Sequence, residues 1–310
     1  MTRLIQFRAL LAIILLASAC TKKSGEMPAT EEKTEEREGQ PSQVQRITLQ
    51  IEATFDALSD GARIVAPVAL DRRYQKITKT EHVIEPKQKG MSGVPERSAD
   101  KENLIFVSGP ISVPKATYKA NYDVEIRSMK PGVFDSIAGQ AYGEFNDPKL
   151  KAALKAVANP AADPHGVVAA AFKTAKAQAD VDAYTLASSF SEALKQGGVP
   201  HRLVQGLLLG DGSAKPHVWT EVLLPQLGWA PFDPYSARSA ADDDTAYRGQ
   251  HPPDRLRVLF GDAFALAKKA DRPELALKSP FLSPRALIPG ADGSVKEVAG
   301  KVTYTVASPK

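Results

Sequence analysis

Two polar residues in the second half of the chain have side chains suited to proton transfer. His217 begins the segment HVWTEVLLPQLGWAPFDP, and Asp233 lies near its end. The segment predicts a strand, a turn and a second strand. A histidine oriented by a carboxylate is the general base of covalent acyl transfer, which also needs a nucleophile. The chain has one cysteine, Cys20, which lies far from this segment in sequence.

The segment that precedes His217 predicts the helix on which such a nucleophile would lie. VDAYTLASSFSEALKQGGVPHR indicates a helix from about Asp182 to Gln196, which the following GGVP ends. Apolar residues at helical spacing, including Ala187 and Phe190, predict the face that packs on the core. An apolar strand, LVQGLLL, follows the turn.

In order and spacing, these segments resemble the transglutaminase-like core of the papain-type superfamily. Its members run G-D-C-x-x-x-A, a helix, G-I-P-A-R, a strand, H-A-W-V-E-V and W-x-x-x-D-P. The resemblance places His217 on the catalytic histidine and Asp233 on the aspartate that orients it. It places Asp182 before the nucleophile. The nucleophile position itself holds Ala183, whose methyl group cannot attack a carbonyl.

The resemblance implies an α+β fold, with a papain-like transglutaminase core and a cleft between helix and sheet. Trp219, Asp182 and Tyr184 are the candidate cleft residues beside Ala183. In the family, the positive end of the helix dipole lowers the pKa of the thiol at this position. The His217–Asp233 pair also has a purely structural interpretation, because removing one buried partner leaves the other unpaired, at a cost of about 1–3 kcal/mol.

The N-terminus predicts a lipid-anchored export signal. Arg3 and Arg8 precede an apolar run, and Ala17-Ser18-Ala19 leads directly to Cys20. This layout resembles a bacterial lipobox, which implies cleavage after residue 19 and a lipid thioether on Cys20. Because Thr21 follows the cysteine instead of aspartate, the resemblance implies an outer-membrane lipoprotein facing the periplasm if the source is Gram-negative.

Composition argues against several classes of site and partner. The formal charge of +4 falls to +2 when Arg3 and Arg8 are removed, and the remaining charges are interspersed, so nucleic acid is not an expected partner. One cysteine allows no disulfide within the chain. No cofactor or metal is expected, because four histidines lack the paired spacing of a zinc site: His82, His165, His201 and His251.

Composition and periodicity predict five segments along the chain. Residues 1–19 form the signal peptide, and residues 20–45, rich in Glu, Lys, Ser, Gly and Pro, form a disordered tether. Residues 46–130 alternate in polarity and predict a small β-sandwich, in which residues 47–58 and 62–70 pair as a hairpin across Asp60-Gly61. The family resemblance places the transglutaminase-like core at residues 140–275, with a helix near 263–270, and residues 276–310 are a C-terminal extension with one strand.

Three functions follow from the sequence and its resemblance. The first is a membrane-anchored pseudoenzyme of the cell envelope that binds a peptide or another envelope protein without cutting it. The second is an active hydrolase or acyltransferase that uses a displaced nucleophile, such as Thr185 or Ser188, or a water activated by His217. The third is a structural lipoprotein without a ligand.

Overall fold

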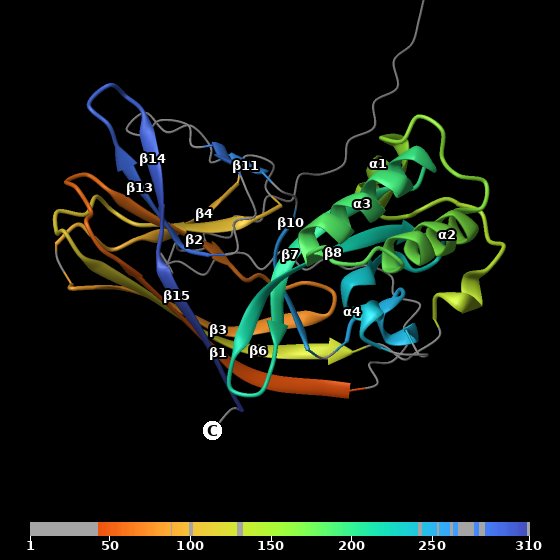
Figure 1. The fold of residues 1–310 in the computed structure, drawn as a ribbon, viewed down its shortest axis with the longest axis horizontal. Helices are drawn as coiled ribbons and strands as arrows, with labels where there is room; N and C mark the ends of the chain where they lie inside the picture. Colours follow the sequence, from red (N-terminus) through yellow and green to blue (C-terminus); the bar gives the residue numbers. More distant parts are fainter. Residues whose placement is uncertain are drawn as a thin grey trace, which may run out of the picture. The chain divides into compact units, whose positions relative to one another are not determined.

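The computed structural model describes residues 43–87, 89–98, 102–128, 133–240, 244–252, 254–260, 263–265, 276–278 and 283–308. The predicted signal peptide, Cys20 and nearly all of the predicted tether lie outside these ranges. All described residues belong to one compact unit, Glu36–Lys310 (Figure 1). No helix within these ranges has the length and apolarity needed to cross a membrane.

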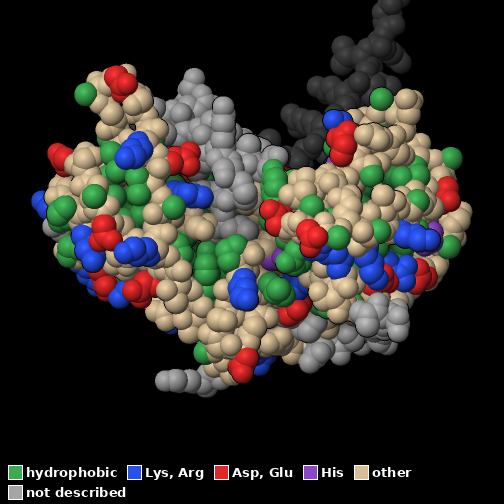
Figure 2. Space-filling model, viewed as in Figure 1, with side chains coloured by type: hydrophobic (Ala, Val, Ile, Leu, Met, Phe, Trp, Pro, Cys, Tyr) green, Lys and Arg blue, Asp and Glu red, His purple; other side chains and the backbone are tan. Residues whose placement is uncertain are grey.

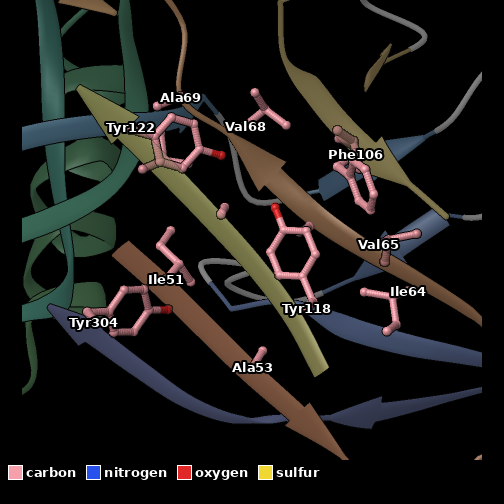
Figure 3. Close-up of a cluster of buried hydrophobic side chains, with 14 of the residues drawn as sticks. Ile51, Ala53, Ile64, Val65, Val68, Ala69, Phe106, Tyr118, Tyr122 and Tyr304 are labelled. Carbon is pink, nitrogen blue, oxygen red and sulfur yellow. The ribbon is translucent and has the colours of Figure 1, made fainter. Parts of the chain in front are cut away.

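Two antiparallel sheets form the β part, and their alternating residues fill one core. The first sheet has the order β15-β1-β6-β3, and the second has the order β14-β13-β2-β5-β4. Their bounds are β1 (Gln43–Phe55), β2 (Arg63–Val68), β3 (Gln75–Glu85), β4 (Val94–Arg97), β5 (Leu104–Val107), β6 (Ala116–Ser128), β13 (Arg285–Pro289), β14 (Val295–Ala299) and β15 (Lys301–Ala307). Figure 3 shows Tyr118 and Tyr122 of β6 among apolar side chains from both sheets.

The predicted hairpin between residues 47–58 and 62–70 is wrong. β1 pairs with β6 and β15, whereas β2 lies in the other sheet between β13 and β5. The turn at Asp60-Gly61 exists, with Gly61 at φ 81°, but it carries the chain across to the second sheet. β2 is buried from Ile64 to Val68, as expected of a central strand and not of a half-exposed hairpin partner.

Pro67 lies in this central strand without breaking it. β13 pairs with β2 only at Arg63, Ile64 and Val65, whereas β5 pairs with it from Val65 to Val68. Pro67 therefore lies beyond the end of β13, where one side of β2 needs no N–H donor.

C-terminal strands complete both sheets of the β part. β15 pairs with β1 from Thr48↔Ala307 to Thr54↔Lys301, and β13 pairs with β2. The sandwich is therefore assembled from both ends of the chain, which the predicted segments do not anticipate. The predicted helix near 263–270 is wrong at its start, where β11 (Ala263–Ala265) pairs with β12 (Ala276–Lys278), and its remainder lies outside the described residues.

Helices and a separate four-stranded sheet form the remaining part, in agreement with the predicted α+β class. Three helices begin after an aspartate whose side chain accepts a backbone N–H of the first turn: Asp147 for α1 (Pro148–Lys155), Asp163 for α2 (Pro164–Lys176) and Asp182 for α3 (Ala183–Gln196). The four-stranded sheet has the order β10-β7-β8-β9, with β7 (His201–Leu209), β8 (Ala214–Leu224), β9 (Gly228–Phe232) and β10 (Arg255–Phe260). Three short helices are also present, namely η1 (Asp135–Ile137), α4 (Pro234–Arg238) and η2 (Thr245–Tyr247).

The two faces of the β10-β7-β8-β9 sheet have different coverings. α3 packs on one face, where Thr220 donates a hydrogen bond to the carbonyl of Ala187 (3.2 Å) and contacts the hydroxyl of Ser191 (3.1 Å) (Figure 1). The opposite face carries His217, Trp219 and Glu221, because side chains alternate along β8. This second face holds most of the charged residues described below.

The β part contacts the edge strand β10 through the side chain of Gln75. Its amide donates to the carbonyl of Arg257 and accepts the N–H of the same residue, each at 2.8 Å. Gln75 is buried, and the register of β10 shifts just after Arg257. The amide therefore takes the place of a neighbouring strand at this point of β10, and it joins the two parts through buried hydrogen bonds.

Charged side chains of both signs are interspersed on the face that Figure 2 shows. Blue Lys and Arg groups alternate with red Asp and Glu groups over both the β part and the helices. Two exposed ion pairs illustrate this pattern, Arg46 with Glu125 (2.9 Å) and Lys115 with Asp56 (3.3 Å). Such surface pairs contribute little to folding stability.

A histidine in the β part makes stability depend on pH. The His82 ring stacks on the Phe106 ring with a centroid distance of 4.9 Å, and its Nδ1 is 2.8 Å from the Tyr118 hydroxyl. Burial lowers the pKa of His82 from 6.5 to about 4. Between these values the unfolded chain binds a proton that the folded chain does not, so the free energy of unfolding falls as pH falls. We expect this residue to contribute a loss of about 1–2 kcal/mol from pH 7 to pH 5.

Urea denaturation of the wild type and of His82→Phe at the two pH values measures this contribution. The variant should lose less stability on acidification than the wild type, whatever its stability at pH 7. His251 is present in both proteins, and burial also lowers its pKa, so its contribution cancels in the comparison. Equal losses in the two proteins would contradict the assignment to His82.

Candidate functional site

His217 lies near the start of β8, on the face of the sheet opposite α3. It pairs in register with Gly206 of β7, and its ring is buried, with 4% of its surface exposed. A Cβ at Gly206 would lie 2.4 Å from the Trp219 ring and 2.2 Å from the carbonyl oxygen of Leu256. The glycine therefore leaves the space in which the side chains of this face pack.

Asp233 directly follows β9 and is hydrogen-bonded to His217. His217 Nε2 lies 2.7 Å from Asp233 Oδ2, and Asp233 Oδ1 accepts the N–H of Ser236 at 3.0 Å as the N-cap of α4. Burial by itself would raise the pKa of the Asp233 carboxyl. The bond to His217 and the charge of Arg255 outweigh burial and hold the pKa well below its ordinary value. The carboxylate is therefore ionised, and hydrogen bonds to His217, Ser236 and Arg255 hold it in one orientation.

Arg255 is the third partner, and the sequence analysis did not select it. Its Nη2 lies 2.8 Å from Asp233 Oδ2 and donates to the Ser236 hydroxyl at 2.7 Å. Its Nη1 contacts Asp254 Oδ1 at 2.6 Å, and the guanidinium is buried, with 3% exposed. The pattern RLRVLF carried a usable signal, because arginines that alternate with apolar residues share one face of a strand and need carboxylates when buried.

Trp219 lies beneath His217 and is buried, with 1% of its surface exposed. Its ring stacks on the His217 ring with a centroid distance of 6.1 Å, and the His251 ring meets it edge-on at 6.5 Å. His251 in turn stacks on Tyr74 at 5.1 Å. Trp219 therefore supports His217 from inside the protein, and it is part of the core instead of an open cleft wall.

Glu221 continues the same face and is paired with two arginines. Arg202 donates to its Oε2 through Nε (2.9 Å) and Nη2 (2.7 Å), and Arg257 Nη2 lies 2.8 Å from Oε1. Burial favours a higher pKa for this fully buried carboxyl, but the charges of Arg257 and Arg202 reverse the shift and lower it. Arg202 also lies 4.3 Å from the centre of the Trp229 ring. This ion cluster fixes β7, β8 and β10 relative to one another.

The first turn of α3 holds the other predicted site residues. Asp182 is exposed, and its Oδ1 accepts the N–H of Thr185 at 2.7 Å, which lowers the pKa of the carboxyl. Ala183 is the first residue of the helix and is half-buried. Tyr184 is also half-buried and packs against the core that includes Ala187 and Val218.

α4 connects His217 to the segment that precedes Ala183. The Tyr235 ring lies 5.7 Å from the His217 ring, and the Arg238 guanidinium lies 4.7 Å from the Tyr235 ring. Arg238 also donates to the carbonyl oxygens of Gln178 and Val181, both at 2.9 Å. The same short helix therefore contacts the imidazole and holds the chain two residues before Ala183.

A family model described as the transglutaminase-like superfamily matches residues 150–234, which include α3, His217 and Asp233. Residues 150–234 form a transglutaminase-like domain. This result confirms the family resemblance that the motifs predict. No curated protein matches the chain.

Two solved structures are similar to this chain. One is a candidate cysteine protease from Cytophaga hutchinsonii, with 10% identity and a TM-score of 0.50, covering 87% of this chain and 92% of the other. The other is the periplasmic domain of TgpA from Pseudomonas aeruginosa, with 14% identity and a TM-score of 0.26, covering 62% and 88%. The first likeness shows a shared fold.

The transglutaminase-like domain contains a base and its orienting carboxylate. With Nε2 directed to Asp233, the Nδ1 atom of His217 is the ring nitrogen that remains for a substrate or a nucleophile. Position 183 supplies only a methyl group. The arrangement can hold and move a proton at His217, but it provides no covalent step at the family's nucleophile position.

The described residues contain no cluster of metal ligands, and a surface cavity among them lies away from the predicted site residues. In the ranges given above, no three residues among His, Cys, Asp and Glu group closely enough to hold a metal ion. A surface cavity of about 300 Å³ lies between β1, the β7–β8 turn and the end of β15. Its lining includes Ile47, Leu209 and Asp254, but none of the predicted site residues.

Proposed function

We propose that this chain is an envelope lipoprotein whose transglutaminase-like domain binds a peptide or protein partner without acyl-transfer activity. The observation that carries the proposal is the composition of the first turn of α3. Ala183 occupies the nucleophile position, and the single cysteine of the chain is Cys20. A buried, oriented base without a nucleophile preserves the fold of the site but not the chemistry that gives it turnover.

The hydroxyl groups near the site support this proposal over a displaced nucleophile. The Ser236 hydroxyl accepts a hydrogen bond from Arg255, and the Ser191 hydroxyl contacts Thr220. Thr185 lies on the exposed side of α3, where its N–H donates to the N-cap residue Asp182. Ser236, Ser191 and Thr185 therefore each have a structural partner, Thr185 through its side-chain hydrogen bond to Asp182, whereas an activated serine or threonine hydrogen-bonds to its base.

The proposed location at the membrane rests on the N-terminal residues. A lipid on Cys20 would attach the protein to the bilayer, and residues 21–42 would then join the anchor to β1. The folded part would therefore stay within reach of partners on the periplasmic side of the membrane.

Activity assays on the purified full chain test the absence of acyl transfer. We expect no amine incorporation, peptide hydrolysis or amide hydrolysis above the level of His217→Ala, because neither protein has a nucleophile at position 183. An acyl probe should label no serine or threonine of either protein. Turnover that His217→Ala abolishes would overturn the proposal in favour of a displaced nucleophile or an activated water.

Labelling of expressing cells with radioactive palmitate tests the anchor separately. The wild type should incorporate the label and sediment with membranes, and Cys20→Ser should do neither. A labelled Cys20→Ser protein would overturn the proposed attachment site without changing the conclusion on activity.

A further inference from the structure

One carboxylate oxygen of Asp233 accepts hydrogen bonds from both His217 and Arg255. Oδ2 accepts from His217 Nε2 at 2.7 Å and from Arg255 Nη2 at 2.8 Å, with Arg255 Nε at 3.3 Å. The other oxygen accepts a backbone N–H of α4. Both the imidazole and the guanidinium are therefore within direct reach of a single carboxylate charge.

Arg255 is held firmly in this position. Ser236 accepts from Nη2 at 2.7 Å, and Asp254 lies 2.6 Å from Nη1. The guanidinium is 3% exposed, whereas the Asp254 carboxylate is 41% exposed. Water therefore screens Asp254 more than Asp233, and Asp233 is the carboxylate on which the charge of Arg255 acts most strongly.

The presence of this arginine changes what the His217–Asp233 pair can stabilise. In covalent acyl transfer through a thiol, the base becomes an imidazolium, and the neighbouring carboxylate stabilises that cation. A permanent guanidinium charge on the same carboxylate oxygen offsets the stabilisation, because arginine does not lose its proton in proteins. Asp233 can still orient the ring of His217, but it has less negative charge available for an imidazolium.

We propose that Arg255 is a positioning residue that fixes Asp233 and offsets its charge, so that the His217–Asp233 pair stabilises an imidazolium less than an unshared carboxylate would. This inference rests on the proposed function, in which the wild-type domain performs no acyl transfer. It predicts that a thiol restored at position 183 is weakly activated while Arg255 is present.

The pH dependence of thiol alkylation tests the charge effect directly. Ala183→Cys and Ala183→Cys with Arg255→Gln are treated with iodoacetamide over about pH 5–10, and mass spectrometry follows the peptide that contains position 183. Glutamine can still donate a hydrogen bond to Asp233 but carries no charge. We expect the pKa of the introduced thiol to fall by about one unit in the second protein, with alkylation about tenfold faster near pH 6.

Two further variants separate charge from structure. Ala183→Cys with Arg255→Lys keeps the positive charge and should alkylate with the profile of Ala183→Cys alone. Ala183→Cys with Asp254→Asn removes the other carboxylate contact of Arg255 and should not lower the thiol pKa. If Arg255→Gln does not fold, as judged by circular dichroism, Arg255→Met keeps a side chain of similar length without charge and carries the same test.

The outcomes distinguish this inference from the proposed function. Equal profiles with and without Arg255 would overturn the inference, and so would a fall of equal size with Arg255→Lys. A thiol that titrates like free cysteine in every variant would show that position 183 is not coupled to the His217–Asp233 pair, and it would overturn the inference as well. Acyl-transfer turnover by the wild type would instead overturn the proposed function.

Discussion

Replacing Glu221 by alanine should lower the free energy of unfolding by about 3–5 kcal/mol. The carboxylate is fully buried and takes three hydrogen bonds or ion-pair contacts of 2.7–2.9 Å from Arg202 and Arg257. Alanine would leave the 4%-exposed Arg257 side chain without its carboxylate partner in the protein interior. The loss should exceed that of most surface substitutions, because an uncompensated buried charge costs more than the pair contributes.

Urea denaturation at neutral pH measures this loss against a matched surface pair. Asp56→Ala removes a carboxylate whose partners Lys115 and Lys301 lie 3.3 and 3.9 Å away on the exposed surface, and it should change stability by less than about 1 kcal/mol. Glu221→Gln keeps the shape of the side chain, and its loss of unfolding free energy should lie between those of Glu221→Ala and Asp56→Ala. A Glu221→Ala protein as stable as Asp56→Ala would show that water enters and solvates the arginines.

The helices and the site strands could be predicted because their signals are local. Asp147, Asp163 and Asp182 each precede a helix and cap it through the side chain, as their sequence positions predict. The strand with His217 and the strand that ends at Asp233 are adjacent in sequence and pair directly. Short-range order of this kind depends on residues within a few positions of one another.

Strand pairing in the β part could not be predicted, because it joins distant residues. β1 finds its partners at residues 116–128 and 301–307, and nothing near residue 55 indicates them. The Asp60-Gly61 turn is compatible with both a hairpin and a crossing to the second sheet. The continuous apolar run of β2 was the better guide, since a strand buried on both faces has no polar alternation.

The charged half of the site was also missed for a physical reason. The family motif contains His217 and Asp233, but Arg255 comes from β10, on the far side of β7 from β8. Its guanidinium reaches Asp233 only because residues on the same face of a sheet meet across strands. A motif read along the chain therefore finds the base and its carboxylate, whereas the residue that shares the carboxylate appears only in three dimensions.

Replacing Gly206 by alanine should lower the free energy of unfolding by about 3 kcal/mol or more. A Cβ there would lie 2.2 Å from the carbonyl oxygen of Leu256 and 2.4 Å from the Trp219 ring. The carbonyl belongs to β10, which pairs with β7, so it cannot move away without breaking the sheet. Displacement of Trp219 would in turn disturb His217, whose ring stacks on it. The substitution therefore strains the fold and the site together.

Gly143→Ala is the matched control, because no atom lies within 4 Å of a Cβ at that position. Its stability should match or slightly exceed that of the wild type, since alanine reduces the conformational freedom of the unfolded chain. Thermal and urea denaturation compare the three proteins, and tryptophan fluorescence reports the environment of Trp219 and Trp229. Similar stability for Gly206→Ala and Gly143→Ala would mean that β7 and β10 separate easily. In that case the close packing of Gly206 against Leu256 and Trp219 would contribute little to the stability of the sheet.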